Sequence, residues 1–221
     1  MLKRMSGPII IGLGGIAILL SLGFWQVQRL SWKQSVLADI EARISAPAVP
    51  LGVTDTPDKY APVSLTGKTF GPEIHVLVSR KQIGAGYRII TGFETDQGRK
   101  LLLDRGFVKL DAADTPRPEI ALELTGNIHT PDDRTSSTPP NDAAKNIWFA
   151  RDIPDMAAAL QTEPLLIIAR SDTGQGVEAM PVGPEGIPND HLQYAITWFS
   201  LALVWLGMTL YQLWRIRTKP A

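Results

Sequence analysis

Two long uncharged stretches lie near the two ends of the chain, whereas the region between them alternates short apolar runs with polar turns. Residues 8–24 and 195–214 contain no charged side chain over 17 and 20 positions. At the helical rise of about 1.5 Å per residue they extend roughly 25 Å and 30 Å, close to the thickness of the hydrocarbon core of a bilayer. The pattern therefore predicts transmembrane helices over residues 8–25 and 189–214.

The first stretch has an alternative interpretation as a cleaved signal peptide, because Lys3 and Arg4 form a short basic segment before it. Its apolar run is longer than the usual h-region of about 7–15 residues, and it ends in Gly23-Phe24-Trp25 without an A-x-A cleavage site. These features favour an uncleaved anchor. A buried core helix is a second alternative, but both stretches are apolar around the whole helix circumference, which is typical of a membrane span.

A polar segment follows the first span and keeps helical spacing. Its apolar residues recur three, four or seven positions apart, at Leu30, Leu37, Ile40 and Ile44. Pro47 and Pro50 then end the pattern. We therefore expect an amphipathic helix over residues 26–46 that leaves the membrane. It could also belong to the core of the next domain, and the two interpretations are compatible.

The central region, residues 47–188, has the pattern of a β-rich domain. Short apolar runs separated by turn residues predict strands over 63–70, 74–79, 87–94, 100–110, 120–130, 147–150 and 165–169. One short helix is expected over Pro154–Leu160, and a Gly- and Pro-rich segment, residues 171–188, returns the chain to the membrane. The predicted fold is a membrane protein in which two terminal transmembrane α-helices flank an α+β exoplasmic domain. Its antiparallel sheet would close toward a sandwich or small barrel.

The charges sum to zero, with 22 Lys and Arg against 22 Asp and Glu, but they are unevenly distributed. Residues 1–7 and 215–221 carry five positive charges and no acid, and the region between the spans carries five excess negative charges. By the positive-inside rule both termini are cytoplasmic and the central domain is periplasmic. The start lacks an Arg- and Ser-rich presequence, which favours a multi-pass protein of the bacterial inner membrane. The chain lacks the basic surface that a nucleic-acid-binding protein needs, so a nucleic-acid partner is not expected.

The sequence contains few motifs that specify chemistry. The absence of cysteine excludes disulfides, thiolate metal sites and a cysteine nucleophile. Residues 12–17 match a dinucleotide fingerprint, but they lie within a membrane span and follow no strand. His75 and His129 stand singly in strand-like runs and are interpreted as ordinary histidines.

Small residues form a stripe along the first span. They are Gly7, Gly14, Ala17 and Ser21. Such a stripe could seat the second span or a partner helix, or it could reflect only how common small residues are in membrane helices.

The entry to the second span is the one segment that suggests a cofactor. Asp190 can cap the helix, and on a helix the next residues His191, Tyr194, Ala195 and Trp198 share one side. Neutral imidazole is a common axial ligand of haem iron. We therefore consider His191 as an axial haem ligand, with the macrocycle lying across Ala195 and contacting Tyr194 and Trp198; the only metal involved would be the haem iron. The alternative is that His191 only forms hydrogen bonds in the headgroup zone.

Several stretches along the chain resemble one known family. They are residues 23–29 (GFWQVQR), 86–93 (GYRIITGF), 103–108 (LDRGFV), 124–126 (LTG), 148–152 (WFARD) and 189–199 (NDHLQYAITWF). In this order, between two terminal spans, they are similar to the Surfeit locus protein 1 family of cytochrome c oxidase assembly factors, in its bacterial form.

The resemblance implies a non-enzymatic biogenesis factor for a haem–copper terminal oxidase. It implies that the second-span histidine, here His191, binds haem a and that the protein assists haem delivery to the oxidase core subunit. The implied partners are this subunit, haem a synthase and the lipid bilayer. Two alternatives remain. One is a scaffold that stabilises an oxidase intermediate without binding haem. The other is an anchored hydrolase, which would need a catalytic cluster within residues 60–170 that the sequence does not display.

Overall fold

The structure, a computed structural model, describes residues 2–81, 83–184 and 187–218, with side chains from residue 5 onward. Internal contacts divide the chain into two units. One unit contains the two terminal helices, residues 1–39 and 184–221, and the other is the central domain, residues 40–183. Of the charges used for the orientation, Lys3, Arg4 and Lys219 lie outside the described side chains.

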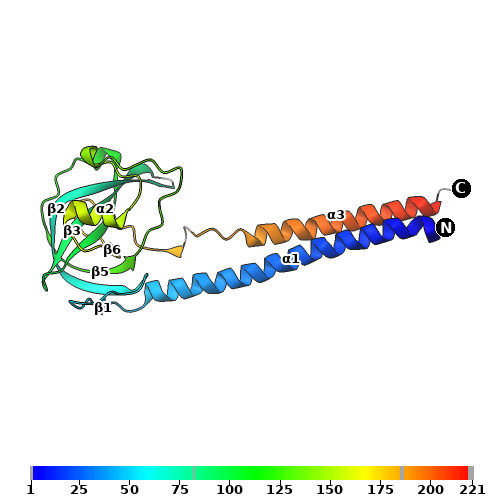
Figure 1. Ribbon diagram of the computed structural model, residues 1–221, viewed down its shortest axis with the longest axis horizontal. Helices are drawn as coiled ribbons and strands as arrows, with labels where there is room; N and C mark the ends of the chain where they lie inside the picture. Colours follow the sequence, from blue (N-terminus) through cyan, green and yellow to red (C-terminus); the bar gives the residue numbers. More distant parts are fainter. Residues whose placement is uncertain (1, 82, 185–186, 219–221) are drawn as a thin grey trace. The chain divides into compact units, whose positions relative to one another are not determined.

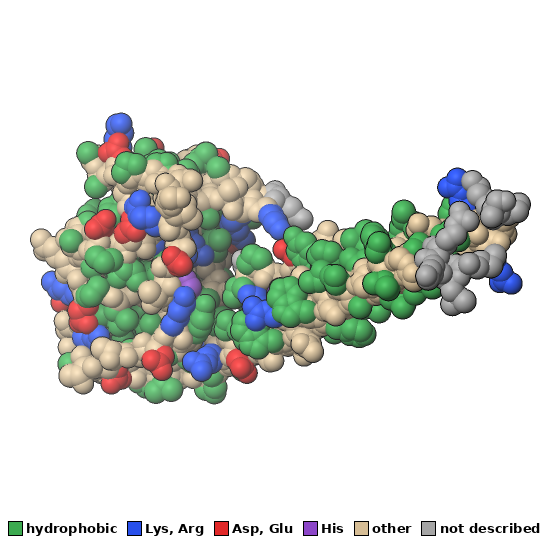
Figure 2. Space-filling view, turned by 45° about the vertical axis from the view of Figure 1, so that its right-hand side comes forward, with side chains coloured by type: hydrophobic (Ala, Val, Ile, Leu, Met, Phe, Trp, Pro, Cys, Tyr) green, Lys and Arg blue, Asp and Glu red, His purple; other side chains and the backbone are tan. Residues whose placement is uncertain are grey.

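Two long helices make up most of the first unit. Helix α1 covers Leu2–Ser45 and helix α3 covers His191–Thr218. Both are long and apolar enough to cross a membrane, which fits a membrane protein. The predicted span and the predicted amphipathic helix lie in one continuous helix, because no helix breaker stands between residue 9 and Pro47 except glycines. Figure 2 shows hydrophobic side chains covering much of this helix pair.

Helices α1 and α3 run side by side and antiparallel, and glycines of α1 make their close approach possible (Figure 1). A Cβ atom added at Gly15 would lie 2.3 Å from Trp205 Nε1, and one at Gly23 would lie 2.6 Å from the Phe199 ring. The Trp205 indole N–H donates to the carbonyl of Gly12, with an N···O distance of 3.2 Å. Small residues thus permit van der Waals packing where no hydrophobic effect drives association.

The small-residue stripe predicted from the sequence is not the one that seats α3. Cβ atoms added at Gly7 and Gly14 would meet nothing within 4 Å. The contact uses Gly12, Gly15 and Gly23, which face a different direction on the same helix. Because glycine is frequent throughout this span, its positions alone do not indicate which of its faces is covered.

The central domain is a six-stranded sheet with one short α-helix. Its elements are β1 (Val49–Pro50), β2 (Pro62–Arg80), β3 (Gly84–Thr95), β4 (Lys100–Lys109), β5 (Ala121–His129), α2 (Ile153–Leu160) and β6 (Leu166–Ala169), with single 3₁₀ turns at Leu110–Ala112 and Ala143–Lys145. The strand order is β1-β2-β3-β4-β6-β5, and β2 also pairs with β5.

The sheet is mixed, which corrects the expected antiparallel sheet. Strands β1 and β2 pair in parallel, and so do β4 and β6. The second pairing is possible because β5 and α2 lie between β4 and β6 in the chain: β6 runs antiparallel to β5 and so returns in the direction of β4. Although β2 pairs with both β3 and β5, the sheet is not a clear barrel or sandwich. The link between β4 and β5 runs through β6, which has only four residues.

Three of the predicted strands differ from those observed. The runs at 63–70 and 74–79 belong to one strand, β2, because the chain passes Gly71-Pro72 as an irregularity and not as a turn. Gly71 has a φ of 74°, which suits a residue without Cβ at such a bulge. Residues 147–150 form no strand; Trp148 makes a single bridge to Val76.

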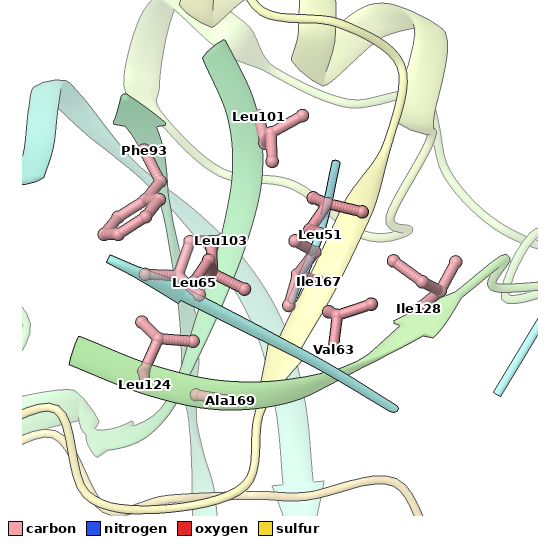
Figure 3. Packing of buried hydrophobic residues seen from close by; sticks show 10 residues of the cluster. All are labelled: Leu51, Val63, Leu65, Phe93, Leu101, Leu103, Leu124, Ile128, Ile167 and Ala169. Atoms are coloured by element: carbon pink, nitrogen blue, oxygen red, sulfur yellow. The ribbon is translucent and has the colours of Figure 1, made fainter. Parts of the chain in front are cut away.

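Apolar side chains of the strands form two clusters. Figure 3 shows the first, to which β2, β3, β4, β5 and β6 all contribute: Leu51, Val63, Leu65, Phe93, Leu101, Leu103, Leu124, Ile128, Ile167 and Ala169. The second cluster lies beneath α2, whose Met156, Ala157 and Leu160 pack against residues such as Ile90 and Leu102. Alternate residues of a strand point to opposite faces, so β4 supplies Leu101 and Leu103 to one cluster and Leu102 to the other.

The end of α1 is held by polar side chains of the domain. Asn127 Nδ2 donates to the carbonyls of Ile44 (3.1 Å) and Tyr60 (3.0 Å). Arg170 donates to the carbonyls of Ile44 and Ala46, and its Nε donates to Asn127 Oδ1 (2.9 Å). These bonds satisfy carbonyls that the helix end leaves free, and a cation there complements the helix dipole.

His129 lies partly buried beside the Tyr60 ring, with its Nδ1 atom buried and without a hydrogen-bond partner among the described residues. Burial, and then the positive charges of Arg151 and Lys59, lowers the pKa of His129 from 6.5 to about 4. Because its folded pKa is the lower one, the unfolded chain binds this proton first as the pH falls.

We expect the domain to lose stability between pH 6.5 and about pH 4 through this residue, by up to about 3 kcal/mol. A His129→Gln variant should lack this part of the pH dependence. Unfolding free energies of the two proteins, measured from pH 4 to 7.5 in detergent, would check it. Parallel curves for wild type and variant would contradict the expectation.

Candidate functional site

His191 is the first residue of α3 and is partly buried. The preceding residue, Asp190, accepts the first helical hydrogen bond through its carbonyl, from the Tyr194 N–H (3.2 Å). The imidazole of His191 lies against α1, where its Nδ1 atom is 2.8 Å from Gln26 Oε1. The structure thus joins two polar side chains that are 165 positions apart.

Gln26 is an unusual residue for its place on α1. It is only 8% exposed, although the residues on either side of it, Trp25 and Val27, are both exposed. Its Oε1 atom has no proton and can only accept, so the shared proton belongs to His191 Nδ1. When Nδ1 donates to Gln26, Nε2 is the ring nitrogen that can offer a lone pair to a metal ion.

The other predicted site residues are divided between two environments. Ala195 is 3% exposed, and it lies between His191 and Phe199, whose side chains contact Gln26 and Phe24 of α1. Ala195 is therefore covered by α1. Tyr194 is 55% exposed, and Trp198 is partly buried. The arrangement brings His191 together with Gln26. It buries Ala195 and leaves Tyr194 exposed.

Gln26 was missed as a site residue, although it stands in one of the stretches that carry the family resemblance. The available signal was an uncharged polar residue directly after an apolar run. That signal does not identify a partner, because it gives no information on which part of the distant second span lies opposite. Only the pairing of the helices supplies this information.

The polar groups of the domain are mostly engaged with one another. Asp104 is fully buried and accepts hydrogen bonds from Arg88 and from the Gly106 N–H (3.1 Å). Arg151 lies 3.5 Å from the same carboxylate and donates to Asp133 (2.6 Å). Burial raises the pKa of Asp133, but the hydrogen bonds from Arg151 outweigh it, and the pKa lies below its usual value.

Two further ionisable side chains of the domain, Glu73 and His75, lie close together. Glu73 pairs with Arg117 (2.7 Å), and His75 lies 3.6 Å from the same carboxylate. Among the described residues, no three His, Asp or Glu side chains are placed to hold a metal ion. Asp104, Gly106 and Arg151 stand in stretches that carry the family resemblance, and all three make contacts inside the domain. A Cβ at Gly106, whose φ is 126°, would lie 2.1 Å from the Glu178 carbonyl.

The chemistry of the His191 site fits a haem ligand. It offers one imidazole nitrogen, oriented by a hydrogen bond through the other ring nitrogen, beside apolar helices. A haem needs such a nitrogen for its iron and apolar surroundings for its ring. No thiolate is required.

The chain has an apolar helix near each end, a mixed-sheet domain between them in the sequence and a histidine at the start of the second helix. These features fit a membrane protein. A sequence profile described as the SURF1 family matches residues 13–203. The matched region includes both Gln26 and His191. The chain belongs to the SURF1 family.

Individual relatives agree with this membership. Surfeit locus protein 1 of Xenopus tropicalis is 33% identical over 212 residues, which cover 82% of this chain and 67% of the relative. A SURF1-like protein of the bacterium Rickettsia felis is 30% identical over 202 residues, covering 84% of this chain and 88% of the relative. The human Surfeit locus protein 1 is 29% identical over 212 residues, covering 82% and 69%.

Proposed function

We propose that this protein is a non-enzymatic biogenesis factor for a haem–copper terminal oxidase. It binds haem a through His191 and assists its delivery to the oxidase core subunit. The observation that carries the proposal is the His191–Gln26 contact of 2.8 Å, which occupies Nδ1 and leaves Nε2 as the ring nitrogen for a metal ion at the end of an apolar helix. Membership of the SURF1 family, a family of cytochrome c oxidase assembly factors, supports the same role.

The physical properties of the cargo agree with this site. Haem a has a farnesyl tail and a large apolar ring, so a carrier should hold it at membrane depth. Two exposed apolar helices provide such an environment, and His191 stands at the end of one of them. Iron coordination by a single residue of the carrier also suits a cargo that must later be released.

The proposed location is the bacterial inner membrane, with both termini cytoplasmic and the domain periplasmic. The basic ends of the chain and the acidic excess between the spans support this orientation. In this position the domain would contact the oxidase core subunit and haem a synthase. The SURF1-like relative from a bacterium supports the bacterial setting.

Removing the imidazole should remove most of the bound haem. We expect wild-type protein, co-produced with the enzymes that make haem a, to be purified with a Soret band. His191→Ala should reduce the bound haem about tenfold or more, since the iron loses its protein ligand. Optical and pyridine-haemochrome spectra would measure this.

His75→Gln, which changes a histidine of the domain, is the matched control and should retain the haem. Equal haem content in His191→Ala and wild type would reject His191 as the ligand. If the wild type binds no haem, and His191→Ala restores oxidase assembly in a deletion strain, the protein is instead a scaffold for an assembly intermediate.

A further inference from the structure

The Gln26 side chain has a more specific role than filling the helix interface. It is a polar group that is nine-tenths buried in the helix pair, and its one described hydrogen bond is to His191. Burying an amide without a partner costs roughly 1–3 kcal/mol, so this bond stabilises the arrangement in which both side chains meet.

We infer that Gln26 is the positioning residue of the haem site: it holds the proton of neutral His191 on Nδ1 and so keeps Nε2 free to bind iron. The inference rests on the proposed function for the identity of the ligand. The tautomer itself is a property of this chain alone, since Gln26 Oε1 accepts and Nδ1 must donate.

The choice of an amide over a carboxylate has a chemical consequence. A carboxylate that accepts from Nδ1–H makes a histidine more basic and a stronger iron ligand, as in carboxylate–histidine–metal triads. A neutral amide makes a weaker acceptor and avoids burying a charge beside apolar helices. Gln26 thus orients the ring while leaving the iron–nitrogen bond moderate in strength, which suits a carrier that releases its cargo.

The register of the two helices places Gln26 opposite His191. Gly23 lies one turn before Gln26 and admits the Phe199 ring, and Phe24 contacts the same ring with centroids 5.4 Å apart. A shift of one helix along the other by a single turn, about 5.4 Å, would separate Oε1 from Nδ1. The glycine contacts therefore position the hydrogen bond as well as the helices.

The first test needs no haem. The full chain has three histidines, so ¹⁵N-histidine labelling in detergent or nanodiscs would give resolved side-chain signals. In wild type we expect the His191 proton on Nδ1. In Gln26→Leu it should redistribute between both ring nitrogens. The matched control is Gln28→Leu, which changes an exposed glutamine two residues along the same helix and should leave the wild-type tautomer unchanged.

The second test uses the haem-loaded protein. Gln26→Leu should lower the haem affinity about 10- to 100-fold, the usual loss when such a partner of a metal ligand is removed, and we expect the loss as faster haem dissociation. Gln26→Glu should slow dissociation and lower the haem midpoint potential, because a carboxylate strengthens the ligand. If Gln26 had only a structural role, the change in the rate of haem dissociation would not have opposite signs in Gln26→Leu and Gln26→Glu.

An unchanged His191 tautomer in Gln26→Leu would overturn the inference, whatever happens to haem. Haem dissociation that is equal in Gln26→Leu and Gln28→Leu would also overturn it. A tautomer that shifts as expected in a protein that binds no haem would support the positioning role and reject the proposed function. The two ideas can therefore fail separately.

Discussion

Replacement of Asp104 by alanine is expected to destabilise the central domain by about 3–5 kcal/mol. Asp104 has no exposed surface, and its carboxylate faces the guanidinium groups of Arg88 and Arg151. Removal of one partner from a buried ion pair leaves the other charge without compensation, which costs far more than the pair contributes. Arg88 is most affected, because Arg151 keeps its bonds to Asp133.

Hydrogen exchange of the full chain in detergent would measure this effect, with peptides from β3 and β4 as reporters of the domain. Asp104→Asn is a second informative variant, because it retains an acceptor for the Gly106 N–H and removes the charge. Asp114→Ala, at an exposed acid, is the control and should change stability by less than about 0.5 kcal/mol. Similar protection in Asp104→Ala and Asp114→Ala would show that the carboxylate is not needed to balance the buried arginines.

Replacement of Gly15 by isoleucine is expected to separate α1 from α3. The new Cβ would lie 2.3 Å from Trp205 Nε1, so Trp205 must leave its place, and with it the hydrogen bond to Gly12. Such overpacking costs about 1–3 kcal/mol, which lowers the equilibrium constant for helix pairing roughly 5- to 150-fold. Loosened pairing should also weaken the His191–Gln26 contact and speed haem release.

Gly14→Ile provides a closely matched control, since a Cβ at Gly14 meets nothing within 4 Å. Because the chain has no cysteine, spin labels can be placed at Ile10→Cys and Leu210→Cys, two exposed positions on the two helices. Electron–electron dipolar spectroscopy should give a longer and broader distance distribution for Gly15→Ile, and the wild-type distribution for Gly14→Ile. Equal broadening in both variants would mean that the glycine face does not determine the pairing.

Together these variants separate the roles of the stretches that carry the family resemblance. Asp104 and Arg151 stabilise the domain, whereas Gln26 and His191 form the candidate site in the helix pair. A loss of haem in Asp104→Ala should therefore follow unfolding of the domain, while a loss in His191→Ala should occur in a folded protein. Hydrogen exchange and haem content measured on the same samples distinguish these cases.

Local patterns predicted most elements of the domain correctly. The apolar run at 165–169 is β6, and the helix expected over Pro154–Leu160 is α2, which begins one residue earlier. The errors arise where long-range pairing overrides a local signal. Gly71-Pro72 has the composition of a turn, but pairing of β2 with β3 on both sides carries the strand through it. The direction of β6 likewise depends on the connection that precedes it in the chain. The pattern of the four residues of β6 holds no information on this direction.

Composition and periodicity by themselves determined the two long apolar helices, the β-rich region between them and His191 as the residue to examine. These features depend on neighbours within a few positions, or on the hydrophobicity of one stretch. Only the tertiary structure decided which glycines of α1 face α3, that Asp104 balances two arginines, and that Gln26 lies 2.8 Å from His191. Each of these is a contact between distant parts of the chain. Its geometry depends on helix register and strand pairing, which a single sequence does not specify.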